Sequence, residues 1–201
     1  MQIFENTIKY YNLKSETFTN TTQTVDFEST QKRFLSRLHP ASHLLDFGCG
    51  SGRDTKYFLS HGHTVDAIDG SEEMCKIAAK YTGIPVKQML FHRLDEQEKY
   101  DGIWACASIL HLPLQDLETV LHKMSRALKP YGIIYTSFKY GTFEGERNGR
   151  YFTDMTEETF AVLLKRIPTL TLEEQWISSD VRPGRGDEKW LNLTLRKSNI
   201  H

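Results

Sequence analysis

The chain has 201 residues, of which 39% are hydrophobic and 25% are charged. This length and composition suit one globular α/β domain with a core of its own, and two domains would each be unusually small. The formal net charge of -1 at pH 7 argues against the strongly basic surface of a nucleic-acid-binding protein, so we expect no nucleic-acid partner.

The cysteines and the hydropathy of the chain predict its compartment. Cys49, Cys75 and Cys106 are odd in number and far apart in sequence, and none has the spacing of a zinc site. We therefore expect reduced thiols, no metal and a cytoplasmic protein. Residues 1–18 lack an apolar run long enough for a signal peptide or a membrane span, as does the rest of the chain, so we expect no membrane partner.

Helical and strand-like segments alternate along the first 140 residues. Ser71 precedes two acidic residues as a helix N-cap, and Gly83 ends the same helix. This alternation predicts a doubly wound, Rossmann-like, mostly parallel sheet with helices on both faces. The expected helices are 2–13 (a weak pattern), 26–38, 54–60, 71–81 and 115–128, and the expected strands are 43–47, 63–69, 85–90, 100–108 and 133–140.

The pattern changes towards the C-terminus. A helix is expected over 155–167, followed by strands over 170–181 and 189–198 with no helix between them. Two such strands should pair as an antiparallel hairpin with a long loop.

We therefore expect one domain over residues 1–201, divided into three parts. An N-terminal lid segment (1–25) precedes a cofactor-binding core (26–140) and a C-terminal helix and hairpin that carry the substrate loops (141–201). Four aromatic residues of the first segment are the expected lid contacts, and disorder of this segment is the alternative. These residues are Phe4, Tyr10, Tyr11 and Phe18.

A glycine-rich loop follows the first predicted strand, in the stretch LLDFGCGSGRD. Ligands of open α/β sheets bind at the carboxyl ends of the strands, where glycines allow sharp turns and close approach. The three glycines follow the pattern GxGxG, because Arg53 stands where a dinucleotide loop has its third glycine, and the P-loop pattern is absent. These glycines are Gly48, Gly50 and Gly52.

Two acids indicate which ligand the loop binds. Asp46, two residues before Gly48, would repel a pyrophosphate but attract an ammonium or sulfonium group. Asp69 ends the second strand, 21 residues after Gly48, where it can accept the ribose hydroxyls of several cofactors. The two acids together favour S-adenosylmethionine, which carries both cations and no phosphate.

The stretches LLDFGCGSGRD, VDAIDGS, YDGIWACASILHLP and ALKPYGIIYTSFKYG, with the C-terminal hairpin, resemble class I S-adenosylmethionine-dependent methyltransferases over roughly residues 44–197. Within that family they are similar to small bacterial tellurite-resistance-like enzymes. The resemblance implies a seven-stranded sheet whose antiparallel last strand lies between strands five and six. It also implies S-adenosylmethionine as cofactor, bound by Asp46, Gly48, Cys49, Gly50, Gly52, Arg53, Asp69, Gly70, Ser71, Phe91, Ala105 and Cys106.

Several of these residues also suit a structural role in place of cofactor binding. Cys49 and Cys106 also suit small buried positions, and Arg53 also suits packing over the first helical turn. The family often places an acid after strand three to bind adenine, but His92 and Arg93 occupy that position here. Backbone groups or Phe91 are then expected to contact adenine, unless a shifted loop brings Asp95 there.

Basic and aromatic residues gather in two segments after the fifth predicted strand. The resemblance places both segments beside the acceptor pocket, where they would form a clamp for an anion. The alternative is that they are solvated and paired with the neighbouring acids Glu144, Glu146, Asp154 and Asp187. The expected substrate-binding residues are Lys139, Arg147, Arg150, Arg182, Arg185 and Trp190.

These observations predict a methyltransferase acting on a small acceptor that carries a negative charge. Transfer from the sulfonium depends mainly on alignment and water exclusion, because the leaving group is neutral. His111, after the fourth strand, is a candidate general base, with a loop role as the alternative. The rival functions are a non-catalytic S-adenosylmethionine-binding module and a nicotinamide-dependent Rossmann oxidoreductase. The chain fits either a monomer or a homodimer.

Overall fold

The computed structural model describes residues 2–198. Met1 of the predicted lid segment and residues 199–201 of the predicted C-terminal part lie outside the described residues. The helices are α1 (Gln2–Thr22), α2 (Glu28–Leu35), α3 (Arg53–Ser60), α4 (Glu72–Thr82), α5 (Leu114–Ala127) and α6 (Glu157–Leu164), with short 3₁₀ helices η1 (Phe91–Arg93) and η2 (Ile109–His111). The strands are β1 (His43–Phe47), β2 (Thr64–Asp69), β3 (Val86–Gln88), β4 (Tyr100–Ala105), β5 (Leu128–Lys139), β6 (Glu144–Arg147), β7 (Arg150–Thr153), β8 (Leu170–Ser179) and β9 (Lys189–Lys197).

Seven strands form the central sheet in the order β3-β2-β1-β4-β5-β9-β8. The first five strands are parallel, and β9 is antiparallel to both β5 and β8. The predicted doubly wound sheet, with an antiparallel last strand between the fifth and sixth strands, is confirmed. Phe47 of β1 pairs with Ile68 of β2, so the loops after these strands leave the sheet at the same edge.

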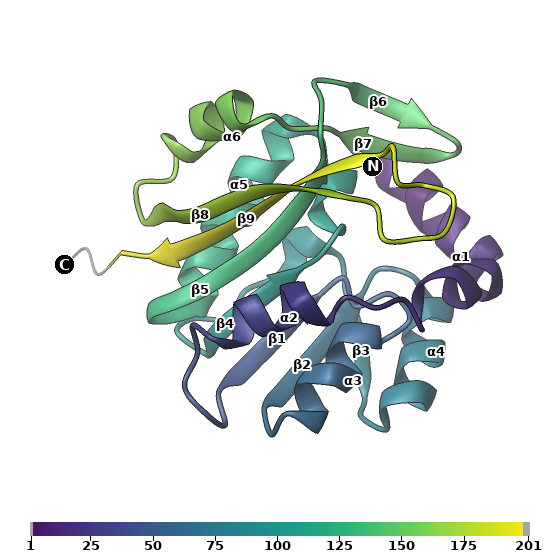
Figure 1. Cartoon of the computed structure of the whole chain (residues 1–201), viewed down its shortest axis with the longest axis horizontal. Coiled ribbons are helices and arrows are strands. Elements are labelled where there is room, and N and C mark those ends of the chain that lie inside the picture. The colour runs from purple at the N-terminus through teal and green to yellow at the C-terminus, as the bar shows by residue number, and fades with distance from the viewer. Residues whose placement is uncertain (1, 199–201) are drawn as a thin grey trace.

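Helices cover both faces of this sheet (Figure 1). Successive residues of β1 point to opposite sides, as expected for a strand buried on both faces. Leu44 belongs to the apolar cluster under α2 and α3, and Leu45 belongs to the cluster under α5 and α6. Trp104 of β4 stacks on Tyr135 of β5, with ring centroids 4.1 Å apart. Both faces of the sheet therefore bury apolar side chains, and this packing fixes the position of the strands.

The predicted N-cap and the predicted C-terminal glycine of helix α4 are confirmed. The Ser71 side chain accepts a hydrogen bond from the Met74 amide at 3.2 Å, and Gly83 closes the helix in the left-handed conformation. This cap holds the first turn of α4 beside the end of β2.

The N-terminal segment is more helical than its sequence pattern predicts. The expected helix ends at residue 13, and the backbone of α1 has a kink at Lys14 before the helix continues to Thr22. The second half is rich in Ser, Thr and Asn, which have low helix propensity. Contacts with the rest of the domain stabilise this half, including a bond just beyond it, from Nε2 of Gln23, the residue after α1, to the Ser51 carbonyl at 2.9 Å.

The hairpin formed by β6 and β7 is not among the elements predicted from the sequence. Arg147 pairs with Arg150 across a two-residue turn, where Asn148 (φ 52°) and Gly149 (φ 76°) both have positive φ. Asn-Gly is the preferred sequence of this tight hairpin turn and is the signal that could have predicted it. In Figure 1 this hairpin lies beside α1, at the edge of the sheet where the glycine-rich loop emerges.

Candidate active site

The loop after β1 is fixed by steric contacts as well as by glycine flexibility. Gly48 has φ +89°, and a Cβ atom there would lie 2.5 Å from the Cβ of Ser108, in the loop after β4. The Ser108 hydroxyl in turn donates to the Phe47 carbonyl at 2.6 Å. Gly48 is therefore required for packing between the two loops, in addition to the close approach of a ligand that a glycine allows.

Asp69 joins the glycine loop to the start of α4. Its two carboxylate oxygens accept hydrogen bonds from the amides of Gly50 at 2.9 Å and Ser71 at 2.8 Å. Burial raises the pKa of Asp69, and these backbone bonds act in the opposite direction. Asp69 lines the cavity, and each of its oxygens can accept a further hydrogen bond, as a ligand for a ribose diol requires.

Asp46 lies beneath the loop and is only 2% exposed. It accepts a hydrogen bond from the Thr55 hydroxyl at 2.5 Å. Burial and the neighbouring carboxylate of Asp54 raise the pKa of Asp46 to about 8. A cation nearby would therefore favour the ionised form of this carboxyl group.

One cavity lies over the strand ends and contains most of the predicted cofactor residues. Asp46, Gly52 and Ala105 do not line it. Burial raises the pKa of Cys106 to about 12 and that of Cys49 well above its usual value, so neither thiol is an activated nucleophile. The predicted residues that line the cavity are Gly48, Cys49, Gly50, Arg53, Asp69, Gly70, Ser71, Phe91 and Cys106.

Among the residues that the structure describes, those that line the cavity directly after β3 are Met89, Leu90, Phe91 and His92, and none of them is an acid. The Phe91 ring packs on Phe47 with centroids 4.7 Å apart. Asp95 does not line the cavity. It pairs with Arg126, and its side chain is 83% exposed.

Helix α1 forms the roof of the cavity through Thr7, Ile8, Tyr11, Phe18 and Thr22. The Asn12 side chain accepts hydrogen bonds from the Ser71 hydroxyl at 2.7 Å and from the Glu73 amide at 3.3 Å.

The sequence interpretation does not include Asn12, because its partners become neighbours only when α1 packs on α4. The aromatic residues Tyr11 and Phe18 line the cavity as expected, whereas the side chain of Phe4 lies outside the described ones.

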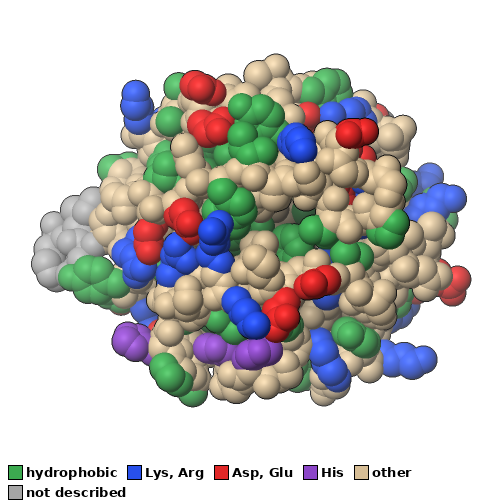
Figure 2. Space-filling model, in the orientation of Figure 1, with side chains coloured by type: hydrophobic (Ala, Val, Ile, Leu, Met, Phe, Trp, Pro, Cys, Tyr) green, Lys and Arg blue, Asp and Glu red, His purple; other side chains and the backbone are tan. Residues whose placement is uncertain are grey.

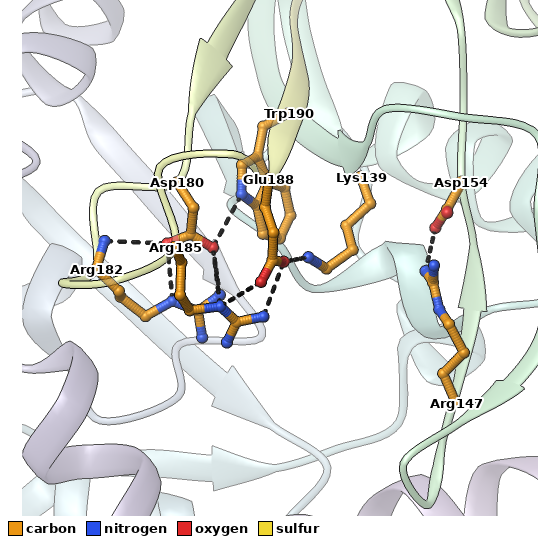
Figure 3. Close-up of polar contacts among 8 residues, drawn as sticks. All are labelled: Lys139, Arg147, Asp154, Asp180, Arg182, Arg185, Glu188 and Trp190. Carbon is orange, nitrogen blue, oxygen red and sulfur yellow. Dashed lines mark hydrogen bonds and ion pairs between the residues drawn. The ribbon is translucent and has the colours of Figure 1, made fainter.

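Most of the predicted anion clamp is occupied by acids of the chain itself. Figure 3 shows Arg182 on Asp180, Arg185 and Lys139 on Glu188, and Arg147 on Asp154. Arg182 Nε lies 2.9 Å from Asp180 Oδ1, and Arg185 Nη2 lies 2.8 Å from Glu188 Oε2. Trp190 donates to Asp180 at 3.2 Å.

The alternative of pairing with acids of the chain therefore describes Lys139, Arg147, Arg182 and Arg185 in this structure, and a joint role in binding an acceptor stays a prediction. The long β8–β9 loop folds two of its own carboxylates onto its basic residues, and these neutralise the charge locally. The sequence indicates Asp154 as an alternative partner, but it does not indicate Asp180 or Glu188. Lys139, Arg150, Arg182, Arg185 and Trp190 line the cavity, but Arg147 does not.

Arg150 differs from the other basic residues of this group. Within residues 2–198 it pairs with no carboxylate, and its one hydrogen bond runs from Nη1 to the Tyr11 hydroxyl at 3.3 Å. Its guanidinium lies 4.4 Å from the ring centroid of Tyr10 and 5.0 Å from that of Phe152. Nε is buried without a partner. Arg150 is thus a cation with unused donors beside the cavity.

His111 is held on both sides. Its Nδ1 lies 2.6 Å from the Tyr151 carbonyl oxygen, and its Nε2 lies 2.8 Å from the Tyr11 hydroxyl. Burial lowers the pKa of His111 to about 3, and the positive charge of Arg150 acts in the same direction. The imidazole is neutral near pH 7, and Tyr11 occupies the nitrogen that a direct base would use.

Two features of the described residues concern nucleic-acid and membrane partners. On the face shown in Figure 2, acidic and basic side chains are interspersed rather than gathered in one basic patch. None of the helices in the described part of the chain is long and apolar enough to cross a membrane.

Comparisons with known proteins agree with this site. A family model described as a methyltransferase domain matches residues 44–132, which contain the glycine loop and Asp69. Bovine N-terminal Xaa-Pro-Lys N-methyltransferase 1 is 34% identical over 125 residues, or 55% of this chain and 56% of that protein. The chain thus spans little more than half the length of this relative.

Among solved structures, Burkholderia thailandensis 1,6-didemethyltoxoflavin-N1-methyltransferase, with bound 1,6-didemethyltoxoflavin and S-adenosylhomocysteine, superimposes with a TM-score of 0.75. It is 25% identical, and the match covers 96% of this chain and 85% of that one. The [4+2]-cyclase SpnF, at 15% identity, has a TM-score of 0.74 with 94% of each chain covered, and it shows the fold alone. The topology and these matches show that the chain has the class I methyltransferase fold, and that residues 44–132, with the glycine loop and Asp69, are similar to a methyltransferase domain.

Proposed function

We propose that this protein transfers the methyl group of S-adenosylmethionine to a small acceptor that carries a negative charge. The observation that carries the proposal is one cavity lined both by Asp69 and the glycine loop, which we assign to the cofactor end, and by Arg150, which we assign to the acceptor end. In this arrangement Asp69 binds the ribose and Gly70 and Ser71 lie beside the adenosine. Phe91 contacts the adenine, and Asp46 favours the ammonium group from beneath the loop.

The negative charge of the acceptor is inferred from Arg150. A guanidinium with unused donors at a partly buried site attracts a carboxylate or another oxyanion more strongly than an exposed lysine would. The name of the bovine relative specifies a different acceptor, a peptide terminus of the sequence Xaa-Pro-Lys, which is cationic. Arg150 would repel such a peptide, and this charge preference separates the two acceptor classes.

The roof formed by α1 supports the lid function of residues 1–25. Its contacts with Ser71, Glu73 and Ser51 hold it over the cofactor end, and Tyr11 reaches the acceptor end. A closed roof excludes water from the sulfonium, which is the main requirement of this reaction. We extend the proposal to a cytoplasmic enzyme of the tellurite-resistance-like subgroup, on the resemblance of the motifs.

The proposal is tested with methyl-labelled S-adenosylmethionine and matched probes. Anthranilate and anthranilamide differ in the carboxylate, and a Ser-Pro-Lys peptide represents the cationic class. We expect transfer to anthranilate in preference to the other two probes. Arg150→Ala should raise the KM for anthranilate by about 10- to 100-fold, because a hydrogen bond to a charged group contributes about 1.5–3 kcal/mol. The Kd for S-adenosylmethionine should not change.

Arg147→Ala is the matched control, because Arg147 pairs with Arg150 across the hairpin but is bound to Asp154 outside the cavity. Preferred transfer to the peptide, or an equal loss of cofactor affinity in Arg150→Ala, would contradict the proposal. Cofactor binding without transfer to any acceptor would favour the non-catalytic binding module.

A further inference from the structure

A chain of hydrogen bonds joins three separate elements at the acceptor end of the cavity. Arg150 of β7 donates from Nη1 to the Tyr11 hydroxyl of α1 at 3.3 Å. Tyr11 lies 2.8 Å from Nε2 of His111, which ends η2, and His111 Nδ1 lies 2.6 Å from the Tyr151 carbonyl oxygen. Tyr11 and His111 both line the cavity.

The donor of each hydrogen bond in this series can be assigned by starting from the Tyr151 carbonyl. The Tyr151 carbonyl can only accept, so His111 Nδ1 carries a hydrogen and donates it. Because burial and Arg150 keep the imidazole neutral near pH 7, its Nε2 has a lone pair and no hydrogen. The Tyr11 hydroxyl therefore donates to Nε2.

This assignment leaves one hydrogen-bonding position on Tyr11. The phenol oxygen has two lone pairs, of which one accepts from Arg150. The second can accept a hydrogen bond from a ligand in the cavity. An N–H or O–H group can donate to this lone pair. A nucleophile without a hydrogen cannot, and the Tyr11 hydroxyl has no hydrogen to offer it, because that hydrogen is donated to His111.

The chemistry of transfer selects between N–H and O–H. An alcohol must lose its proton to become nucleophilic, and a neutral imidazole beside the Arg150 cation is a poor site for that proton. A neutral amine attacks before it loses a proton. The ammonium form of the amine is unreactive, and repulsion between its positive charge and that of Arg150 disfavours it.

We propose that Tyr11 is a positioning residue that accepts a hydrogen bond from a neutral N–H group of the acceptor, and that His111 fixes its orientation. The nitrogen lone pair forms the N–CH₃ bond, and the S–CH₃ bond breaks with its electron pair remaining on sulfur. The cationic methylated product then releases its proton to water. This inference rests on the proposed methyl transfer, and it gives His111 an orienting role in place of the predicted general base.

The first test observes His111 without any acceptor. Nitrogen-15 NMR of the imidazole at pH 7 should show the neutral form with hydrogen on Nδ1, and no titration between pH 5 and 8. Tyr11→Phe should shift the Nε2 signal much more than the Nδ1 signal. A charged imidazole at pH 7, or hydrogen on Nε2, would overturn the inference.

The second test uses anthranilate, N-methylanthranilate and N,N-dimethylanthranilate as acceptors, with two, one and no N–H groups. We expect transfer to the first two only, and Tyr11→Phe should lower their kcat/KM by about tenfold, the effect of one lost hydrogen bond. His111→Gln, which keeps an acceptor atom near the position of Nε2, should retain more activity than His111→Leu. Because the role is orientation, the pH profile of kcat/KM should keep its shape in all variants.

Tyr81→Phe is the matched control, since this exposed tyrosine of α4 does not line the cavity. Full activity of Tyr11→Phe would overturn the inference, as would an acidic limb of the wild-type pH profile that disappears when His111 is substituted. If wild type binds S-adenosylmethionine but methylates none of the N–H probes, the inference fails and the cofactor site stands. If it does not bind S-adenosylmethionine, the proposed function itself fails.

Discussion

Gly48 shows how one residue sets the position of the cofactor loop. Its positive φ is unfavourable for any residue with a side chain, and a Cβ would collide with Ser108 at 2.5 Å. Gly62 has a similar φ of +83°, but no atom lies within 4 Å of the position that a Cβ would take there. Substitutions at these two glycines therefore separate the cost of backbone strain from the cost of steric overlap.

Gly62→Ala should cost about 1–2 kcal/mol of unfolding free energy, the usual cost of the left-handed region. Gly48→Ala should cost about 1–3 kcal/mol more because of overpacking, and it should weaken S-adenosylmethionine binding more than tenfold. Urea denaturation and calorimetric titration measure both effects. Equal costs for the two variants would show that the contact with Ser108 is unimportant.

Asp46 makes the stability of the ligand-free protein depend on pH. Its pKa is raised to about 8 in the folded protein, so the protonated folded state is favoured at low pH. This contribution is complete below the unfolded pKa of about 4 and is lost as the pH rises through about 8.

Relative to Asp46→Asn, wild type should therefore lose stability between pH 5 and 8, by at most about 1.4 kcal/mol per pH unit. Saturating S-adenosylmethionine should reduce this slope, because its cations favour the carboxylate. Urea denaturation at pH 5, 6.5 and 8 makes the comparison. A constant difference between the two proteins at all three pH values would contradict the pKa assignment.

Helix α1 connects the two halves of the site. Asn12 binds the first turn of α4, Gln23 binds the glycine loop, and Tyr11 binds His111. The sequence pattern predicts the part of the helix before the kink and the lid position of Tyr11. It does not predict the second half, because tertiary contacts rather than intrinsic propensity stabilise that half.

Asn12→Ala should loosen the roof without altering the cavity walls. Two hydrogen bonds are lost, each contributing about 1 kcal/mol, so amide hydrogen exchange in α1 should be about tenfold faster or more. Dissociation of S-adenosylhomocysteine should accelerate as well. Asn20→Ala, an exposed position on the same helix, is the control. Unchanged exchange and dissociation in Asn12→Ala would exclude Asn12 as an anchor of α1.

The two ends of the cavity differ in how far the sequence predicts them. The cofactor end consists of short motifs at strand ends, so Gly48 and Asp69 could be placed once the strands were identified. The acceptor end depends on which acids a long loop folds inward. Asp180 and Glu188 neutralise basic residues for which the sequence indicates no such partners, and Arg150 remains without an acid among the described residues.

We propose that the cavity binds S-adenosylmethionine with Asp69 as the ribose ligand. Calorimetric titration of wild type and Asp69→Ala with S-adenosylmethionine, and separately with NADH, distinguishes this cofactor from a nicotinamide dinucleotide. We predict one binding site for S-adenosylmethionine in wild type, at least a tenfold weaker affinity in Asp69→Ala, and no heat from NADH. Binding of NADH without S-adenosylmethionine, or equal cofactor affinity in the two proteins, would contradict the claim.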